Sequence, residues 1–255
     1  MNSRERCLAI LDTLEKHQKA EVKELAKSFG VSEMTVRRDL NRLSGQYNIV
    51  RTYGGAVMEN QPIVRVTSYD EFQITNVEKK EKIAARAASL VKNGQRIFID
   101  AGSTTRGILN YLPADLQAVV VTNHLKVAER ALQFDNISVI MLGGEMIKIA
   151  NCSSGIVAEE QLQKYQLNQA FLGTGAIGSD GRLYDGYSTT ARLKNEIFLM
   201  AEKTYILADS SKVNTYDLNE FGSLNQITAV ITDDGIDEEG KNLFARYHAN
   251  LIIAE

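Results

Sequence analysis

The stretch VSEMTVRRDLNRL, residues 31–43, decides what the first part of the chain is. Ser32 is a good N-cap because its hydroxyl can accept a free backbone N–H, and Glu33 suits the positive end of a helix dipole. Val36, Leu40 and Leu43 recur at helical spacing and form one apolar stripe. The stretch therefore predicts a capped helix that buries this stripe and turns its arginines outward.

Two shorter helices precede this one. Apolar residues recur at helical spacing within residues 4–16 and again within 22–28. Gly30 then supplies a turn, because glycine takes positive φ at little cost. A helix, a glycine turn and a capped helix in this order are typical of a helix-turn-helix, whose second helix reads DNA.

The arginines of the capped helix are the candidate base-reading residues. Thr35, Arg38 and Arg42 fall on or near the face opposite the apolar stripe, and Arg37 flanks it. An arginine can bond two acceptors of guanine at once, which suits such a helix to DNA. Surface arginines on an amphipathic helix taken alone more often form a solvated face. The order of the surrounding elements is what favours DNA binding.

A β-prone segment, NIVRTYGGAVM, follows at residues 48–58. It predicts a hairpin wing with its tight turn at Gly54-Gly55, in which Arg51 touches phosphate. Residues 1–57 carry ten Lys and Arg against seven Asp and Glu, whereas the rest of the chain carries nineteen against twenty-five. A small basic head on an acidic body favours a polyanionic partner for the head.

VSEMTVRRDLNRL followed by VRTYGGAV resembles the DNA-binding head of the DeoR family of bacterial transcriptional regulators. The resemblance implies a winged helix-turn-helix over residues 1–57 that reads double-stranded operator DNA. One departure is SGQYN at 44–48, where the family usually has Glu-x-x-Gly before the wing. The residues assigned to DNA contact are Ser32, Met34, Thr35, Arg37, Arg38, Arg42 and Arg51.

The rest of the chain has a different pattern. Residues 58–74 lack periodicity and include Pro62, so they are interpreted as a linker. From residue 75 to 255, apolar runs at 96–100, 118–123, 137–144, 170–177, 204–209, 229–234 and 250–254 alternate with helical segments. This alternation predicts a Rossmann-like, mostly parallel α/β domain with a sheet buried on both faces.

Glycines and small polar residues follow several of these strands, where open α/β sheets bind ligands. DAGSTT, residues 100–105, is expected to enter a helix near Thr104 and to cradle an anion. Gly143-Gly144, Gly173-Thr174-Gly175 and the segment 209–212, with Lys212, occupy corresponding places. Each of these taken alone is an ordinary turn or a surface lysine, but together they favour one shared pocket.

The resemblance to the DeoR family extends through this domain. DAGSTT, VVVTNH, MLGGE, AFLGTGAI, ADSSK and VITDDGI stand in the order of its effector domain, which is similar to ribose-5-phosphate isomerase and glucosamine-6-phosphate deaminase and binds phosphorylated sugars. The implied phosphate contacts are Gly102, Ser103, Thr104, Thr105 and Lys212. The implied sugar contacts are Asp100, Asn123, Gly143, Gly144 and Gly175.

A second departure precedes ARLK at residues 191–194. Relatives commonly carry glutamates here, whereas this chain has Ser188, Thr189 and Thr190. A missing carboxylate removes a hydroxyl acceptor or general base. We therefore expect a different sugar from the commoner ones and no catalytic residue in this segment.

Composition excludes several classes of protein. With 44% hydrophobic and 24% charged residues the chain is expected to fold as a soluble globular protein. It has no apolar run of about 20 residues and no signal peptide, so we expect a cytoplasmic protein without a membrane partner. Cys7 and Cys152 are expected to be free thiols, and the three histidines are scattered. No metal site and no cofactor are predicted.

The leading hypothesis is a repressor of carbohydrate or nucleoside catabolism genes that a phosphorylated sugar releases from DNA. Such heads pair across two-fold operators, so a homodimer or homotetramer is expected. The alternative is a sugar-phosphate isomerase or deaminase with Asp100, Glu145 or Asp185 as general base, but the spacing pairs none of them with a partner. An RNA-binding or structural adaptor has no stacking aromatics near the basic head to support it.

Overall fold

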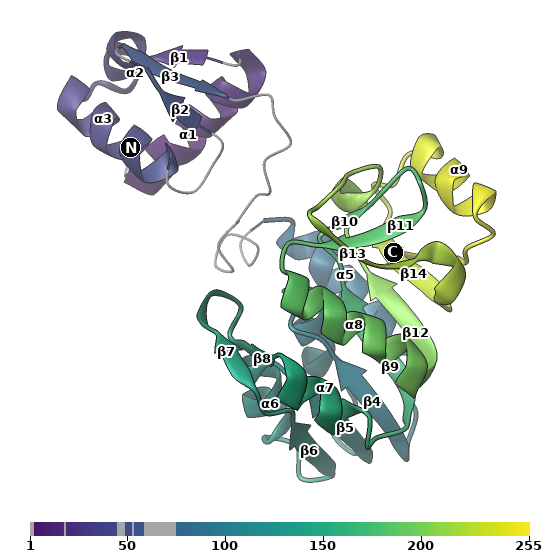
Figure 1. Cartoon of the computed structure of the whole chain (residues 1–255). Coiled ribbons are helices and arrows are strands. Elements are labelled where there is room, and N and C mark those ends of the chain that lie inside the picture. The colour runs from purple at the N-terminus through teal and green to yellow at the C-terminus, as the bar shows by residue number, and fades with distance from the viewer. Residues whose placement is uncertain (1–2, 18, 45–48, 53, 59–74) are drawn as a thin grey trace. The chain divides into compact units, whose positions relative to one another are not determined.

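The computed structural model describes residues 3–17, 19–44, 49–52, 54–58 and 75–255 (Figure 1). The chain divides into two compact units, Met1–Ser68 and Tyr69–Glu255. We call them the head and the body. The predicted linker, 58–74, lies outside the described residues except for Met58, which ends a strand of the head.

The head contains the three predicted helices: α1 (Ser3–His17), α2 (Val22–Phe29) and α3 (Glu33–Ser44). Gly30 ends α2 in the left-handed conformation with φ of 64°, as the turn required. Ser32 Oγ accepts the N–H of Thr35 at 3.2 Å, which confirms the predicted N-cap. The helix-turn-helix was thus predictable from its cap, its turn and its apolar spacing.

Packing inside the head follows the apolar stripe of α3. Val36, Leu40 and Leu43 are buried against residues of α1 and α2 such as Ile10 and Leu25. Leu8 belongs to the same apolar run of α1 but is 56% exposed, because it lies on the other side of that helix.

A three-stranded antiparallel sheet completes the head. Its strands are β1 (Lys19–Glu21), β2 (Ile49–Arg51) and β3 (Gly55–Met58), in the order β1-β3-β2. The pairing of β2 with β3 confirms the predicted wing, whereas β1 was not predicted. A Cβ on Gly55 would collide with the carbonyl oxygen of Ala20, so this glycine permits the close approach of β1 and β3 and is not needed for positive φ at a turn.

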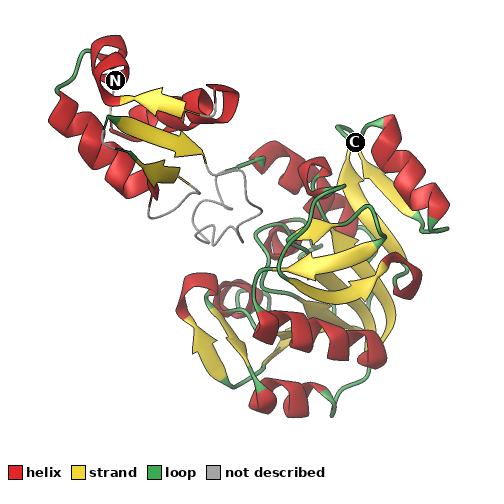
Figure 2. Ribbon diagram, turned by 45° about the horizontal axis from the view of Figure 1, so that its top comes forward, coloured by secondary structure: helices red, strands yellow, loops and turns green. Residues whose placement is uncertain are grey.

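The body is built on a seven-stranded sheet in the order β15-β14-β12-β9-β4-β5-β6. Strands are yellow and helices red in Figure 2. All six neighbouring pairs are parallel, which confirms the predicted Rossmann-like α/β class. The strands are β4 (Gln95–Ile99), β5 (Ala118–Thr122), β6 (Ile137–Met141), β9 (Leu167–Gly173), β12 (Ala201–Leu207), β14 (Ala229–Asp233) and β15 (Leu251–Ala254).

Helices cover both faces of this sheet. Ile97 and Ile99 of β4 pack with apolar residues of α5 (Val77–Ala88) and α6 (Leu125–Ala131). Phe98, between them, points to the opposite face, where α7 (Ile156–Leu162), α8 (Ser188–Met200) and α9 (Glu238–Arg246) contribute to the second core. Burial on both faces explains why the strands are apolar throughout. None of the helices in the described ranges is long and apolar enough to span a bilayer.

Two predicted elements of the body differ in the structure. AFLGTGAI was predicted as one strand, but β9 ends at Gly173 and β10 (Ala176–Ile177) joins β11 (Arg182–Asp185) and β13 (Asn219–Ser223) in a separate antiparallel sheet. The helix expected near Thr104 is a short 3₁₀ helix, η1 (Thr105–Asn110). A further hairpin, β7 (Glu145–Ile147) and β8 (Cys152–Ser154), follows β6.

Candidate functional sites

The outward face of α3 is the first candidate site. Met34 is 75% exposed and Arg38 is exposed. Both lie opposite the buried stripe, and Asn41, which the sequence reasoning missed, is exposed on the same side. Thr35 and Arg37 flank this face and are half-buried. A long apolar side chain, a guanidinium and an amide side by side can contact a thymine methyl, a guanine edge and an adenine edge.

Contacts within α3 restrict two of the predicted DNA-contacting residues. The hydroxyls of Ser32 and Thr35 lie 2.9 Å apart and share a hydrogen bond, so Ser32 acts first as the cap of the helix. Arg37 Nη2 lies 3.8 Å from Oε2 of Glu33, one turn earlier. The side chains of Arg42 and Arg51 lie outside the part of the chain that the structure describes.

The aspartate that follows the two arginines is structural. Asp39 is buried, and its Oδ2 accepts a hydrogen bond from Nε of Arg6 on α1 at 2.6 Å. This hydrogen bond raises the pKa of Arg6. Asp39 therefore links α3 to α1 and does not face outward with Arg38.

The second candidate site lies where the strands of the body end. Thr105 is fully buried, and its hydroxyl accepts the N–H of Gly102 at 2.9 Å and donates to the carbonyl of Asp100 at 2.7 Å. The loop after β4 is therefore held internally by Gly102 and Thr105. In the same loop Ser103 is half-buried and Thr104 is buried. These two predicted phosphate contacts take no part in the hydrogen bonds between Gly102, Thr105 and Asp100.

Lys80 of α5 is affected by the charges of two further cations: Arg106 of η1, which follows this loop directly, and Lys212 of η3 (Ser210–Lys212). Burial lowers the pKa of Lys80, and the charges of Lys212 and Arg106 lower it further, against the opposing effect of Asp209. Charges act this way only at short range, so Lys80 lies within electrostatic range of both Lys212 and Arg106. We call Lys80, Arg106 and Lys212 the cation group. Only Lys212 was predicted from the sequence.

A buried lysine lies close to the ends of β4, β9 and β11. Lys194 Nζ forms an ion pair with Asp185, lies 3.2 Å from Oδ2 of Asp100 and donates to the carbonyl of Gly173 at 2.8 Å. It also lies 5.1 Å from the ring centroid of Phe221. Burial opposes its charge, but the two carboxylates prevail and raise the pKa of Lys194 above the ordinary lysine value. Asp100 is thus engaged by this lysine and by the N–H of Gly173, at 3.0 Å.

The segment that lacks the family's glutamates contacts the same ion pair. Thr190 donates its hydroxyl hydrogen bond to Oδ1 of Asp185 at 2.7 Å, and Asp185 also accepts the N–H of Tyr187 at 3.1 Å. Burial would raise the pKa of Asp185, but Lys194 and these hydrogen bonds lower it overall. A carboxylate is therefore present here after all, supplied by β11 and not by the first turn of α8.

The predicted glycines satisfy backbone packing at the strand ends. Gly143 donates its N–H to Oε1 of Gln161 at 2.7 Å, and Gly175 donates to the carbonyl of Tyr184 at 2.8 Å. Gly144 has φ of 129°, which favours glycine. These contacts explain the glycines without requiring a ligand.

Two buried polar atoms at the same strand ends have no hydrogen-bond partner among the described residues: Oδ1 of Asn123 and the hydroxyl of Tyr187. Asn123 Nδ2 donates to the carbonyl of Ser153 at 2.9 Å, so Asn123 lies against β8, and Tyr187 precedes α8. Buried polar atoms left unpaired are costly, so these two are well suited to a polar ligand.

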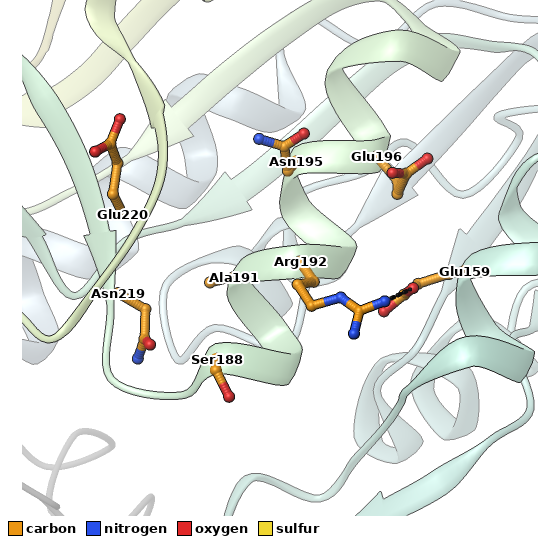
Figure 3. A pocket seen from close by; sticks show the side chains of 8 residues that line it. All are labelled: Glu159, Ser188, Ala191, Arg192, Asn195, Glu196, Asn219 and Glu220. Carbon is orange, nitrogen blue, oxygen red and sulfur yellow. Dashed lines mark hydrogen bonds and ion pairs between the residues drawn. The ribbon is translucent and has the colours of Figure 1, made fainter.

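A separate polar cavity of about 300 Å³ lies beside α8 (Figure 3). Arg192 and Glu159 form an ion pair across it at 2.7 Å. It is lined by Glu159, Ser188, Ala191, Arg192, Asn195, Glu196, Asn219 and Glu220. None of the residues predicted to bind the effector lines it. In the described part of the chain no group of His, Cys, Asp or Glu is arranged to hold a metal ion.

His124 is a structural residue with a perturbed pKa. Its Nδ1 accepts the N–H of Val127 at 3.2 Å and caps α6, and the side chain is fully buried. Burial, with the positive charges of Arg106 and Lys126, lowers the pKa of His124 from 6.5 to about 4.

The stability of the body should therefore fall as the pH drops from 6.5 to 4, because only the unfolded chain takes up the proton of His124 in that window. The full contribution, present above pH 6.5, is about 3 kcal/mol. His124→Asn keeps a capping acceptor but cannot titrate, so urea unfolding of this variant should show a shallower loss over the same pH range. An identical slope in both proteins would contradict the assignment.

Comparison with known proteins agrees with the two units. The family model of the DeoR-like helix-turn-helix domain matches residues 6–62, and that of the DeoR C terminal sensor domain matches residues 75–234. The HTH-type transcriptional regulator YulB of Bacillus subtilis (strain 168) is 34% identical over 91% of this chain and 90% of its own. The glycerol-3-phosphate regulon repressor of Escherichia coli (strain K12) is 30% identical over 91% and 92%. Ribose 5-phosphate isomerase A of Methanocaldococcus jannaschii covers 55% of each chain, with a TM-score of 0.41 and 20% identity.

Proposed function

Since this chain belongs to the DeoR family of transcriptional regulators, with its helix-turn-helix and sensor domains, we propose that it is a repressor of carbohydrate or nucleoside catabolism genes whose operator binding a phosphorylated sugar relieves. The observation that carries the effector half of this proposal is that Lys79 of α5 donates a hydrogen bond to Ser210 at 2.8 Å, so that the neighbouring Lys80 comes within range of the charges of Lys212 and Arg106. Three neighbouring cations at strand ends suit a phosphate ester.

Operator DNA binds to the exposed face of α3. Met34 and Arg38 read base edges, and Thr35, Arg37, Arg42 and the wing residue Arg51 complete the contact. The exposure of Met34 and Arg38 supports this arrangement. The head acts in a homodimer or homotetramer, because one recognition helix per chain suits a two-fold operator. Binding to chromosomal DNA places the protein in the cytoplasm.

The phosphate of the effector binds at the cation group together with Ser103 and Thr104. Its hydroxyls reach Oδ1 of Asn123 and the hydroxyl of Tyr187, two of the four buried polar side-chain atoms without a hydrogen-bond partner among the described residues. Gly102 and Thr105 shape the loop for this purpose, and Asp100, held by Lys194, shapes the adjoining strand end. The relative from Escherichia coli named for a glycerol-3-phosphate regulon is consistent with a phosphate ester as ligand class.

We propose that the body does not turn its ligand over. A general base works best when its pKa lies near the operating pH. Asp185 and Asp100 are both paired with Lys194, and the pKa of Asp185 is lowered, so it is a weak base at neutral pH. Ribose 5-phosphate and glucosamine 6-phosphate should remain unchanged on incubation with the pure protein.

The test is fluorescence anisotropy with labelled duplexes tiled across the DNA that flanks the gene of this protein. Measurements near physiological salt are needed because phosphate contacts make affinity depend on salt. We expect one duplex to bind specifically and one phosphorylated sugar to weaken that binding by about 5–150-fold. Uniform weak binding that no sugar phosphate changes would contradict the proposal.

A further inference from the structure

The first turn of α5 is bonded at two points to residues 209–212, the loop that carries Lys212. Asn76 occupies the N-cap position of α5 and donates from Nδ2 to Oδ1 of Asp209 at 3.1 Å and to Oγ of Ser211 at 3.4 Å. One turn later, Lys79 Nζ donates to Oγ of Ser210 at 2.8 Å. The loop after β12 is therefore attached to the helix that begins the described part of the body.

A buried carboxylate joins these contacts into one unit. Asp233, at the end of β14, is fully buried and lies 2.9 Å from Lys79 Nζ. It also accepts the N–H of Ser210 at 2.6 Å and its hydroxyl at 2.9 Å. Lys79 and Ser210 thus bind the same carboxylate, so α5 and the loop cannot shift independently without breaking hydrogen bonds to a buried charge, which is costly.

The cation group spans the same junction. Lys80, the residue after Lys79, is 8% exposed on α5, whereas Lys212 ends the loop. An anion drawn to both lysines therefore contacts the helix and the loop together. Along the chain, α5 starts at Val77, after the segment that connects the head to the body. A shift of the first turn of α5 therefore moves the end of the connecting segment that joins the body.

We propose that Asn76 and Lys79 are positioning residues that transmit effector binding from the loop 209–212 to the first turn of α5, and from there to the connection with the head. This inference rests on the proposed function, because it takes the cation group as the place where the phosphate binds. Neither residue contacts the effector. They act by fixing the position of the loop relative to the helix. If the effector holds the loop in one position, these hydrogen bonds favour the matching position of the helix, which is the unequal preference for two states that coupling requires.

The experiment uses variants of the full chain that break the junction, and circular dichroism verifies that each variant is folded. Asn76 has φ of 53°, so Asn76→Gly removes the amide while keeping a backbone conformation that glycine accepts. Lys79→Met keeps the apolar stem, and Asp233 retains its hydrogen bonds from Ser210 and Gly235. Lys82→Met is the matched control. Lys82 is also on α5, but it pairs with the exposed Asp234 after β14, at 3.1 Å, and not with the loop 209–212. Lys79→Arg preserves the charge.

Operator affinity is measured by anisotropy with and without millimolar ribose 5-phosphate, glucosamine 6-phosphate, glucose 6-phosphate or glycerol 3-phosphate, and binding of the responding sugar is measured by calorimetry. In Asn76→Gly and Lys79→Met we expect unchanged operator binding without sugar and unchanged sugar binding, but a release of DNA at least about 5-fold smaller than in the wild type. Lys82→Met and Lys79→Arg should respond as the wild type does.

Three results would overturn the inference. If both junction variants release DNA as the wild type does, the coupling role is wrong and the proposed function stands. If they lose the response only because they no longer bind the sugar, the two residues serve binding and not transmission. A wild type that responds to none of the four phosphates contradicts the proposed function, and the inference fails with it.

Discussion

Replacing Lys194 with methionine is expected to destabilise the body by about 3–5 kcal/mol at neutral pH, the usual cost of removing one partner from a buried ion pair. Lys194 is 6% exposed and forms ion pairs with both Asp100 and Asp185. Methionine has a similar volume but leaves two neighbouring carboxylates without a cation. Native-state hydrogen exchange of the β9 amides, which are buried beside the lysine, gives the free energy of opening directly.

The pH dependence of this loss identifies its cause. When two carboxylates share a site, one of them takes up a proton at a raised pKa. The destabilisation of Lys194→Met should therefore shrink as the pH falls towards about 4–5. A second variant, Lys194→Met with Asp185→Asn, removes one of the two charges and should recover part of the lost stability at neutral pH.

Arg192→Met is the matched control for Lys194→Met. Arg192 lies two residues earlier on α8 and pairs with Glu159 at 2.7 Å, but its side chain is 65% exposed. Exposed ion pairs contribute about 0–1 kcal/mol, so this variant should stay near wild-type stability. Equal effects of the two substitutions would show that burial of the Lys194 pair is not what stabilises the body.

The buried lysines could have been predicted from helical periodicity. Lys194 follows Ala191 by three residues and precedes Ile197 by three, so it lies on the buried stripe of α8. Lys80 precedes the buried Ile83 by three residues and the buried Ala84 by four, so it too lies on the buried stripe of its helix, α5. A lysine on an apolar stripe is rarely a solvated residue, because a buried ammonium needs a partner. The sequence analysis assigned no role to either lysine, so it did not predict the cation group or the ion pair.

Other contacts leave no such trace in the sequence. Arg6 and Asp39 are 33 positions apart, and nothing in either segment indicates that they meet. Strand β1 is only three residues long and pairs with β3, so its backbone partners come from a distant part of the chain. Cap, turn and apolar spacing are local and could be predicted, whereas contacts that depend on tertiary approach could not.

The strand-end residues were predicted as a group, and the structure shows which hydrogen bonds they make within the protein. Asp100, Gly102 and Thr105 lie together after β4, as the small polar sequence indicated. Their hydrogen bonds are internal and hold the loop. A sequence pattern of small residues predicts a tight loop, but it does not say which N–H and hydroxyl groups the loop itself uses.

Replacing Arg38 with alanine should weaken specific operator binding by about 5–150-fold, corresponding to the 1–3 kcal/mol of one bidentate contact with a base. Arg38 is exposed on the face of α3 opposite the buried Val36 and Leu40, so its truncation should leave the head folded. The preference for one base pair should relax at the same time. Anisotropy against duplexes that carry each substitution at that position measures both effects.

Arg37 should behave differently because it flanks this face and lies 3.8 Å from Glu33. If it contacts phosphate, Arg37→Ala weakens all sequences alike and lowers the slope of log affinity against log salt by about 1, without relaxing base preference. The double variant should lose specific binding by roughly 30-fold or more, the sum of two contacts at the lower limit. Lys16→Ala, which removes an exposed charge from the end of α1, is the control for charge alone. Specific binding that survives the double substitution would rule out α3 as the recognition helix.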